Sequence, residues 1–249
     1  MVQAGDIFNR TGLLFGPDVM EALSQTRVAI FGVGGVGSWC AEGLVRSGLG
    51  NITIVDPDAV GATNVNRQLM ATTSTIGMPK VEALKERLLE INPEVRVTAV
   101  QARFDETTEG DFDLDSYDYV IDAIDSLKDK IRLILKASES GATFFCSMGA
   151  ALKVDPTRVK VAGFWQVRGC PLGSGIRKKM RRAGTLPVKD FLCVYDDEVL
   201  PNRGDPSLQE VEYDPRKAQV NGSSAHVTSI FGMTLAGLVI KDVYYRIVG

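Results

Sequence analysis

Residues 29–40 read AIFGVGGVGSWC, an apolar run that breaks into glycines and then resumes with a helix-like pattern. Gly32, Gly34 and Gly37 spell the motif G-x-G-x-x-G, and Gly35 is an additional glycine inside it. Glycines let the backbone approach a phosphate closely, and the N–H groups at the start of the following helix favour an anion. The stretch therefore predicts a nucleotide-binding turn between a strand and a helix, with the identity of the nucleotide left open.

Strand and helix patterns alternate on both sides of this turn. Short β-branched and aromatic runs are typical of buried parallel strands, and apolar residues at helical spacing between them are typical of covering helices. The expected strands are 27–32, 51–56, 96–100, 117–125 and 142–150, and the expected helices are 38–48, 79–91 and 126–141. This alternation predicts an α/β fold, a doubly wound and mostly parallel Rossmann-like sheet with helices on both faces.

The second half of the chain has a different pattern. It is expected to form strands around a turn at 153–167, a short basic helix at 175–184 and a further strand at 188–198. A loop at 200–224 and a mostly apolar helix from 225 onward follow. There is no internal repeat and no separate linker. We therefore expect one domain over 1–249, with a nucleotide-binding core at 1–150 and an elaborated C-terminal half at 151–249.

The composition limits the possible classes of protein. The 249 residues are 45% hydrophobic, enough for a sizeable core, and their net charge of −3 gives no overall electrostatic footprint for nucleic acid. No signal-peptide pattern opens the chain, and the longest apolar stretch stops at Lys241, short of the roughly 20 residues that a membrane span needs. Four scattered cysteines contain no C-x-x-C pair, which disfavours structural zinc and favours reduced thiols. We expect a soluble, cytoplasmic protein without a membrane contact.

Residues that follow the strands are expected to meet in one crevice, because the carboxyl ends of parallel strands lie along one edge of the sheet. Gly32, Asp56, Asp122 or Asp125, and residues 147–149 all occupy such positions. Asp56 ends the strand after the glycine turn, where an acidic residue hydrogen-bonds the ribose of a bound nucleotide. The order of strand, glycine turn, helix, strand and acid strengthens the prediction of a nucleotide site.

A group of donors follows in the segment TNVNRQ (63–68), which includes Asn64, Arg67 and Gln68. Lys80 stands at the start of the next predicted helix, where a cation opposes the helix dipole by about 0.3–1 kcal/mol. That position is better explained if a phosphate lies between the cation and the helix end. Arg67 and Lys80 are therefore candidates for clamping a polyphosphate and stabilising the charge of a leaving pyrophosphate. The alternative is that both are solvated surface charges.

The segment IDAIDS (121–126) places two aspartates at the end of the fourth strand. Because side chains alternate along a strand, one of them can face the crevice. A carboxylate there is suited to Mg²⁺, which bridges phosphates through one or two carboxylates and several waters. We assign this role to Asp125, the second aspartate of the segment. The alternative is that Asp125 only caps the N-terminus of the following helix.

Together, segments 32–68, 77–97 and 119–126 resemble the ThiF/MoeB/HesA superfamily, relatives of ubiquitin-activating enzymes that use ATP to adenylate a carboxylate. The resemblance covers about residues 8–150. It implies a homodimer in which Arg10 reaches the partner subunit's site as an arginine finger. It also implies magnesium binding at Asp125. The nucleotide-binding residues that it implies are Gly35, Asp56, Asn64, Arg67 and Lys80.

The second half resembles one branch of this superfamily, the tRNA threonylcarbamoyladenosine dehydratases, through residues 155–184 and 193–201. This resemblance implies that ATP adenylates the threonyl carboxylate of a modified adenosine beside the tRNA anticodon. An intramolecular attack then closes a five-membered ring and releases AMP. Residues 151–249 would bind the substrate and support the dimer.

The basic helix at 175–184 bears on this substrate. Its five cations are Arg177, Lys178, Lys179, Arg181 and Arg182. Such a cluster attracts a phosphate backbone and makes binding salt-dependent, so we expect it to bind tRNA. The alternative is a solvated helix face paired with acidic loops. No DNA partner is expected, and sulfur-transfer proteins are further candidate partners.

Three alternatives to adenylation of tRNA stay open. The first keeps the adenylation but acts on the C-terminus of a ubiquitin-like sulfur-carrier protein; the missing C-x-x-C pairs argue against it. The second is an NAD-dependent oxidoreductase, whose proton donor would have to be the lone His226. The third is a non-catalytic scaffold for sulfur-transfer partners, and the presence of Arg67, Lys80 and Asp125 argues against it.

Overall fold

The computed structural model describes residues 4–205 and 220–249. Within them, seven strands form one sheet in the order β3-β2-β1-β4-β5-β7-β6. The strands are β1 (Arg27–Phe31), β2 (Asn51–Val55), β3 (Arg96–Val100), β4 (Tyr119–Asp122), β5 (Thr143–Ser147), β6 (Lys160–Gly163) and β7 (Leu192–Tyr195). All neighbouring pairs are parallel except β6 and β7, which are antiparallel. This confirms the predicted doubly wound, mostly parallel sheet, and its last two strands come from the second half of the chain.

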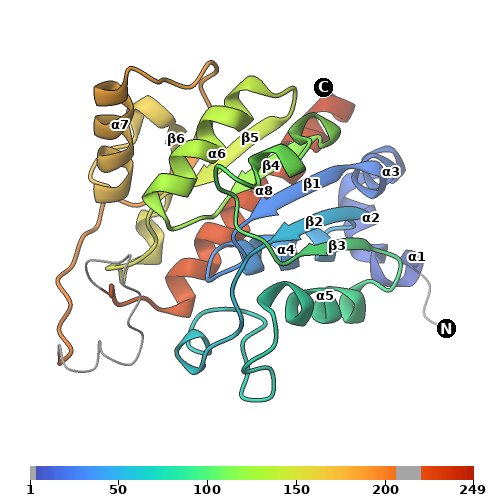
Figure 1. Ribbon diagram of the computed structural model, residues 1–249. Coiled ribbons are helices and arrows are strands. Elements are labelled where there is room, and N and C mark those ends of the chain that lie inside the picture. The colour runs from blue at the N-terminus through green and yellow to red at the C-terminus, as the bar shows by residue number, and fades with distance from the viewer. Residues whose placement is uncertain (1–3, 206–219) are drawn as a thin grey trace.

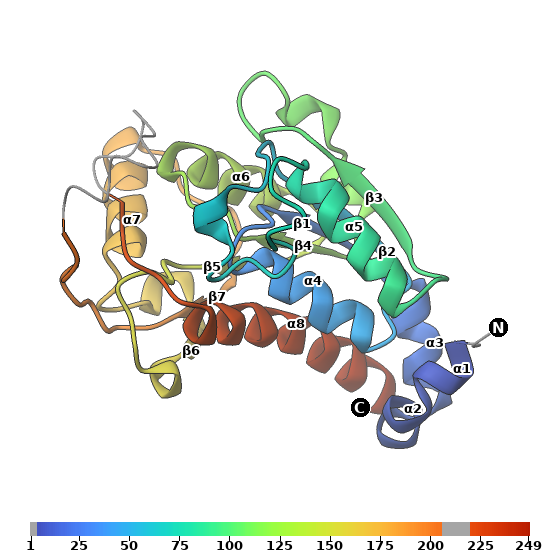
Figure 2. The same ribbon diagram turned by 90° about the horizontal axis from the view of Figure 1, so that it is seen from below.

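Helices cover both faces of the sheet (Figures 1 and 2). They are α1 (Ala4–Ile7), α2 (Asn9–Phe15), α3 (Pro17–Gln25), α4 (Gly37–Arg46), α5 (Lys80–Ile91), α6 (Leu127–Glu139), α7 (Pro171–Ala183) and α8 (Ala225–Val248). Helices α3, α4, α5 and α8 pack into one hydrophobic layer, and α6 and α7 pack into the other. The order of the strands reverses between β1 and β4, and ligands of such sheets bind at this switch point.

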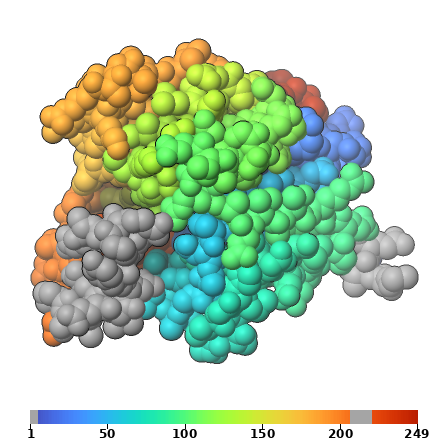
Figure 3. Space-filling model, viewed as in Figure 1, coloured from blue at the N-terminus to red at the C-terminus, as the bar shows by residue number. Residues whose placement is uncertain are grey.

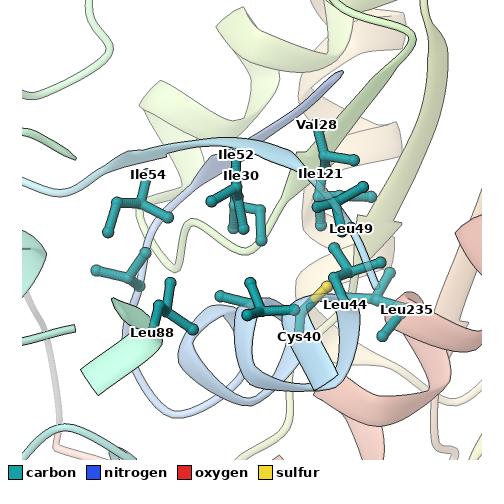
Figure 4. Packing of buried hydrophobic residues seen from close by; sticks show 14 of the residues in the cluster. Val28, Ile30, Cys40, Leu44, Leu49, Ile52, Ile54, Leu88, Ile121 and Leu235 are labelled. Atoms are coloured by element: carbon teal, nitrogen blue, oxygen red, sulfur yellow. The ribbon is translucent and has the colours of Figure 1, made fainter. Parts of the chain in front are cut away.

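The two layers follow from the alternation of side chains along each strand. Val28 and Ile30 of β1 belong to the layer of α4 and α8, whereas Ala29 and Phe31 belong to the layer of α6. Figure 4 shows the first layer, where residues of β1, β2 and β4 point toward Leu44 of α4. Because both faces are covered, the strands are almost continuously apolar, as the sequence shows.

Some predicted boundaries are wrong. The fourth and fifth strands span 119–122 and 143–147, shorter than the predicted 117–125 and 142–150. Of the strands expected over 153–167, only β6 forms. The amides of Val154 and Asp155 instead donate to the carboxylate of Glu198 at 2.6 and 3.1 Å. The carboxylate of Glu198, which is 44 and 43 residues further along the chain, thus takes the backbone donors that a strand partner would have used.

The N-terminal helices α1, α2 and α3 were not predicted. Helix α3 has Pro17 in its first turn and buries Val19 and Leu23, which lie four residues apart on one face. Pro at the first turn and an i, i+4 apolar pair are a helix signal, but a nine-residue element gives that signal little length. These helices lie at the amino end of β1 (Figure 1).

Helix α8 continues through Lys241 to Val248, beyond the predicted end of its apolar stretch. Its buried residues recur every four positions and form a stripe against α4 and the sheet: Val227, Phe231, Leu235, Val239 and Val243. By length and composition alone, α8 is the one helix of the described residues that would be able to cross a membrane. The core helix of a soluble protein passes the same test, so this is weak evidence for a membrane contact.

Candidate active site

The glycine turn after β1 is fixed by close backbone packing. Gly32 has φ +87°, and a Cβ there would lie 2.8 Å from the carbonyl oxygen of Ala123, in the loop after β4. A Cβ on Gly37, the first residue of α4, would lie 1.9 Å from the carbonyl oxygen of Gly32. Only glycine fits at these two positions. The turn therefore brings the start of α4 directly onto the carboxyl ends of β1 and β4.

Asp56, immediately after β2, is held against this turn. Its carboxylate accepts hydrogen bonds from the backbone N–H of Val33 at 2.8 Å and of Asp58 at 3.0 Å. Its side chain is almost fully buried. Burial raises the pKa of Asp56, while Lys80 and the two N–H donors lower it, and the net direction is upward. The residue predicted to bind ribose thus lies beside the glycine turn.

Lys80 is the first residue of α5, and its ammonium group is directed at two carboxylates. Its Nζ lies 3.0 Å from Asp58 Oδ2 and 3.8 Å from Asp56 Oδ1, and the residue is only 6% exposed. The alternative of a solvated surface charge is therefore wrong for Lys80. A buried cation beside the ribose acid and the glycine turn can attract a further anion at this place. Asp58 was not predicted as a site residue, and its position two residues after Asp56 was the available signal.

The segment after β2 folds into a compact loop over the glycine turn. The Asn64 Oδ1 accepts from the Gly61 N–H at 3.0 Å, and Arg67 Nη1 donates to the Thr63 carbonyl at 2.9 Å. The amide of Gln68 lies beside Gly34, whose Cβ would be 3.7 Å from Gln68 Nε2. Gln68 and Arg67 therefore lie beside the glycine turn, and Asn64 belongs to the same loop.

Two buried oxygens of this loop have no hydrogen-bond partner among the described residues: Gln68 Oε1 and Thr63 Oγ1. An unsatisfied buried acceptor costs about 1–3 kcal/mol, and such costs are tolerated where a ligand supplies the missing partner. Thr63 was not predicted as a site residue. Its position next to Asn64 was the available signal.

The loop after β4 contains the two predicted aspartates in contrasting environments. Asp122 is fully buried, and its Oδ1 lies 2.8 Å from Nζ of the equally buried Lys130. Asp125 is exposed and follows the carboxyl end of β4 by three residues. The N-cap residue of α6 is Ser126, so Asp125 lies one residue before the cap. The alternative that Asp125 only caps this helix is therefore wrong. Burial raises the pKa of Asp122. Burial alone would lower the pKa of Lys130, but the neighbouring Asp122 carboxylate keeps that pKa above its ordinary value.

The N-terminus of α8 closes the other side of the turn, which the sequence did not predict. A Cβ on Gly35 would lie 3.3 Å from both Arg67 Cγ and Thr228 Cβ. Asn66 Nδ2 donates to the Ser223 carbonyl at 2.9 Å. His226 lies at the same end of α8, with Nε2 2.9 Å from the carbonyl oxygen of Val154. The extra glycine of the motif thus makes room for both the Arg67 loop and α8.

Helix α7 stands on the outer surface beside α6, at the upper left in Figure 3. Arg177 differs from the other four cations, because its guanidinium donates to the carbonyls of Phe164 and Val167, both at 3.0 Å. Burial lowers the pKa of Arg177. Arg181 lies over the ring of Trp165, 5.3 Å from its centroid. The remaining cations are exposed and make no ion pair within the described residues: Lys178, Lys179 and Arg182.

Arg10 lies in α2, away from the crevice. Helix α8 runs from the glycine turn, where Thr228 contacts Gly35, to α2, where the Tyr244 ring lies 6.0 Å from that of Phe15. Sixteen helical residues span roughly 24 Å. Arg10 is therefore at the opposite end of the molecule from the glycine turn of its own chain.

The family model described as the ThiF family matches residues 8–244. The chain belongs to the ThiF family. It is 40% identical over 239 residues to the tRNA threonylcarbamoyladenosine dehydratase of Bacillus subtilis (strain 168), covering 94% of this chain and 93% of that protein. By contrast, the molybdopterin-synthase adenylyltransferase of Escherichia coli (strain K12) is 34% identical over only 150 residues, 59% of each protein.

Solved structures agree with this ThiF assignment. The E. coli tRNA N6-threonylcarbamoyladenosine dehydratase in complex with ATP has a TM-score of 0.86 and 29% sequence identity, covering 99% of this chain and 98% of that chain. The same enzyme in complex with AMP has a TM-score of 0.87. The predicted superfamily and the predicted branch are thus confirmed, and the relationship extends over both halves of the chain.

Proposed function

We propose that this ThiF chain is an ATP-dependent enzyme that adenylates the threonyl carboxylate of tRNA threonylcarbamoyladenosine. A carboxylate oxygen attacks the α-phosphorus of ATP and displaces pyrophosphate. An atom of the same modification then attacks the activated carbonyl, closes a five-membered ring and releases AMP. The observation that carries this proposal is the similarity to tRNA threonylcarbamoyladenosine dehydratases along nearly the whole chain, 94% of it, whereas the adenylyltransferase match covers only 59%.

The residues around the glycine turn support ATP as the nucleotide. The Asp56 carboxylate would accept hydrogen bonds from the ribose hydroxyls, and the backbone N–H groups at the start of α4 would face the phosphates. Arg67 and Lys80 would stabilise the negative charge that develops on the leaving pyrophosphate. The remaining members of the proposed nucleotide site are Gly32, Gly34, Gly35, Gly37, Asn64 and Gln68. An oxidoreductase is disfavoured because the only histidine, His226, is placed at the Val154 carbonyl.

The residues present fit an Mg²⁺ ion that takes few of its ligands from the protein. Within residues 4–205 and 220–249, no three His, Cys, Asp or Glu side chains gather as a metal site built from protein alone. Mg²⁺ commonly needs only one or two carboxylates, with phosphates and waters completing its shell. The exposed Asp125 at the end of β4 suits that arrangement. When bound, the ion would neutralise charge on the phosphates.

Adenylation of a sulfur-carrier protein is the second candidate within the same chemistry. It is disfavoured because all four cysteines are buried, so none is presented to a carrier: Cys40, Cys146, Cys170 and Cys193.

We also propose a cytoplasmic homodimer. Arg10 shares α2 with Leu13 and Leu14, which are 82% and 73% exposed. An apolar surface beside an arginine that is remote from its own crevice suits a contact in which Arg10 serves the partner subunit.

Residues 151–249 would bind the RNA. Helix α7 carries the exposed cations on a protein that is otherwise mildly acidic. Its first turns lie close to the start of α6, since a Cβ on Gly175 would be 3.3 Å from Leu127, two residues after Asp125. We propose that Lys178, Lys179, Arg181 and Arg182 contact the tRNA backbone. Arg177 belongs to the same predicted set, and we give it the role of holding the Phe164–Val167 segment under α7.

The activity is tested with labelled ATP, Mg²⁺ and three candidate substrates. These are tRNA bearing threonylcarbamoyladenosine, the same tRNA without the modification, and a ubiquitin-like sulfur-carrier protein. We expect AMP and pyrophosphate to form in equal amounts only with the modified tRNA, whose modification loses the mass of one water. AMP release that responds to the carrier protein and not to the tRNA would contradict the proposal.

The role of α7 is tested by the triple variant Lys178→Ala/Lys179→Ala/Arg182→Ala. We expect tRNA binding to weaken about 10–100-fold near 0.1 M salt, and the slope of log affinity against log salt to fall by roughly 2. Binding is measured by filter retention at four salt concentrations. The control removes the same charge elsewhere, as Lys85→Ala/Arg96→Ala/Lys241→Ala. Equal slopes in the two variants would remove α7 from the RNA surface.

A further inference from the structure

A fully buried ion pair lies under the loop between β4 and α6. Asp122 Oδ1 and Lys130 Nζ are 2.8 Å apart, and both side chains are 0% exposed. The second carboxylate oxygen of Asp122 accepts from the Cys146 thiol at 3.3 Å. Removing two charges from water is costly, and replacing such a pair by apolar residues is often neutral or stabilising. Stability alone therefore does not explain why these two residues are charged.

The pair holds both main-chain groups of one residue. Lys130 Nζ donates to the carbonyl oxygen of Ile124 at 2.9 Å, and the N–H of Ile124 donates to Asp122 Oδ1 at 3.0 Å. The preceding residue is fixed as well, because the N–H of Ala123 donates to the Phe31 carbonyl at 2.8 Å. The loop is thus tied at consecutive residues before it reaches Asp125.

The same loop touches the glycine turn. A Cβ on Gly32 would lie only 2.8 Å from the carbonyl oxygen of Ala123. A shift of the loop would therefore also change the space beside the glycine turn. Asp125 itself is exposed, and a carboxylate on an exposed loop pays an entropy cost each time it binds. Groups that orient a metal ligand from behind are commonly needed for full metal affinity.

We propose that Asp122 and Lys130 are positioning residues, which hold residues 123–125 so that the Asp125 carboxylate is set for the Mg²⁺ of bound ATP. This inference rests on the proposed function, because it takes Asp125 as the magnesium ligand. Lys130 acts through the Ile124 backbone and does not touch ATP. The pair therefore affects the enzyme through the placement of one loop.

The test uses the full chain with both charges removed, as Asp122→Asn/Lys130→Met. Two properties are measured: amide hydrogen exchange of residues 123–126 without nucleotide, and the dissociation constant of ATP with Mg²⁺ and with EDTA. We expect faster exchange in this loop and a 10–100-fold smaller gain in ATP affinity from Mg²⁺. ATP affinity in EDTA should stay within about twofold of the wild-type value, because the other nucleotide contacts are intact.

The matched control is Lys128→Met on the same helix, whose Nζ lies 3.6 Å from Glu106 at the surface. Neither property should change in this control. Unchanged exchange and an unchanged Mg²⁺ gain in the double variant would overturn the inference. If the double variant does not fold, Lys130→Arg gives the same measurements with the cation retained in a different shape. Wild-type ATP binding without any Mg²⁺ dependence would contradict the metal role of Asp125 instead, and the exchange data would still decide on the loop.

Discussion

Lys80→Ala is expected to lower the rate of pyrophosphate release by about 10²–10³-fold, the usual effect of deleting one group that stabilises transition-state charge. Lys80 is buried beside the glycine turn, and its Nζ is 3.0 Å from Asp58. A phosphate that enters the turn would meet this ammonium group in surroundings that screen charge poorly. The loss should fall mainly on kcat, because the charge that Lys80 neutralises grows as pyrophosphate leaves.

The control for Lys80→Ala is Lys85→Ala, which removes a cation from the same helix five residues further along. Its turnover should match that of the wild-type enzyme. Removing Lys80 also leaves Asp56 and Asp58 without their nearest cation, so thermal unfolding must be measured on both variants. Lys80→Arg keeps the charge but changes its shape, and should recover part of the rate. If Lys80→Ala retains more than a tenth of the wild-type kcat, the proposed role of Lys80 in charge stabilisation is wrong.

The fold could be predicted from local patterns because each element carries its own signal. Apolar strands that end in glycine or aspartate alternate with amphipathic helices, and this order determines a parallel sheet. The same signal does not specify where a strand ends. Strand β4 ends at Asp122, and both main-chain groups of Ile124 then bond to the Asp122–Lys130 pair, a contact that depends on a residue in the next helix.

The candidate site was predictable where motif and strand end coincide, as at Gly32 and Asp56. It was not predictable where a distant segment completes it. Thr228 lies about 190 residues after the glycine turn in sequence, and only the packing of α8 on α4 brings it to Gly35. Arg177 shows the opposite limit, because composition groups it with the surface cations while the structure directs its guanidinium at two backbone carbonyls.

Gly37→Ala is expected to destabilise the fold by about 3 kcal/mol or more, or to prevent folding, in the absence of any nucleotide. A Cβ at this position would lie 1.9 Å from the Gly32 carbonyl oxygen, and a backbone atom cannot turn aside as a side chain can. The matched control is Gly237→Ala in α8, where nothing lies within 4 Å of the added carbon. Alanine in an exposed helix interior should instead stabilise by about 1 kcal/mol.

A second pair of variants separates clash from backbone strain. Gly77 has φ +89° with open space around its Cβ position, so Gly77→Ala should cost roughly 1–2 kcal/mol through backbone conformation alone. Gly32 has a similar φ of +87° and the Ala123 backbone 2.8 Å away, so Gly32→Ala should cost clearly more than Gly77→Ala. Urea unfolding of the four variants gives the comparison, and a Gly37→Ala stability within 1 kcal/mol of that of Gly237→Ala would contradict it. If the expected order is found, the spacing of Gly32 and Gly37 is required to join β1, α4 and the β4 loop whichever nucleotide binds. The choice of ATP must then lie in the side chains around the turn, Asp56, Arg67 and Lys80 among them, and not in the glycine motif itself.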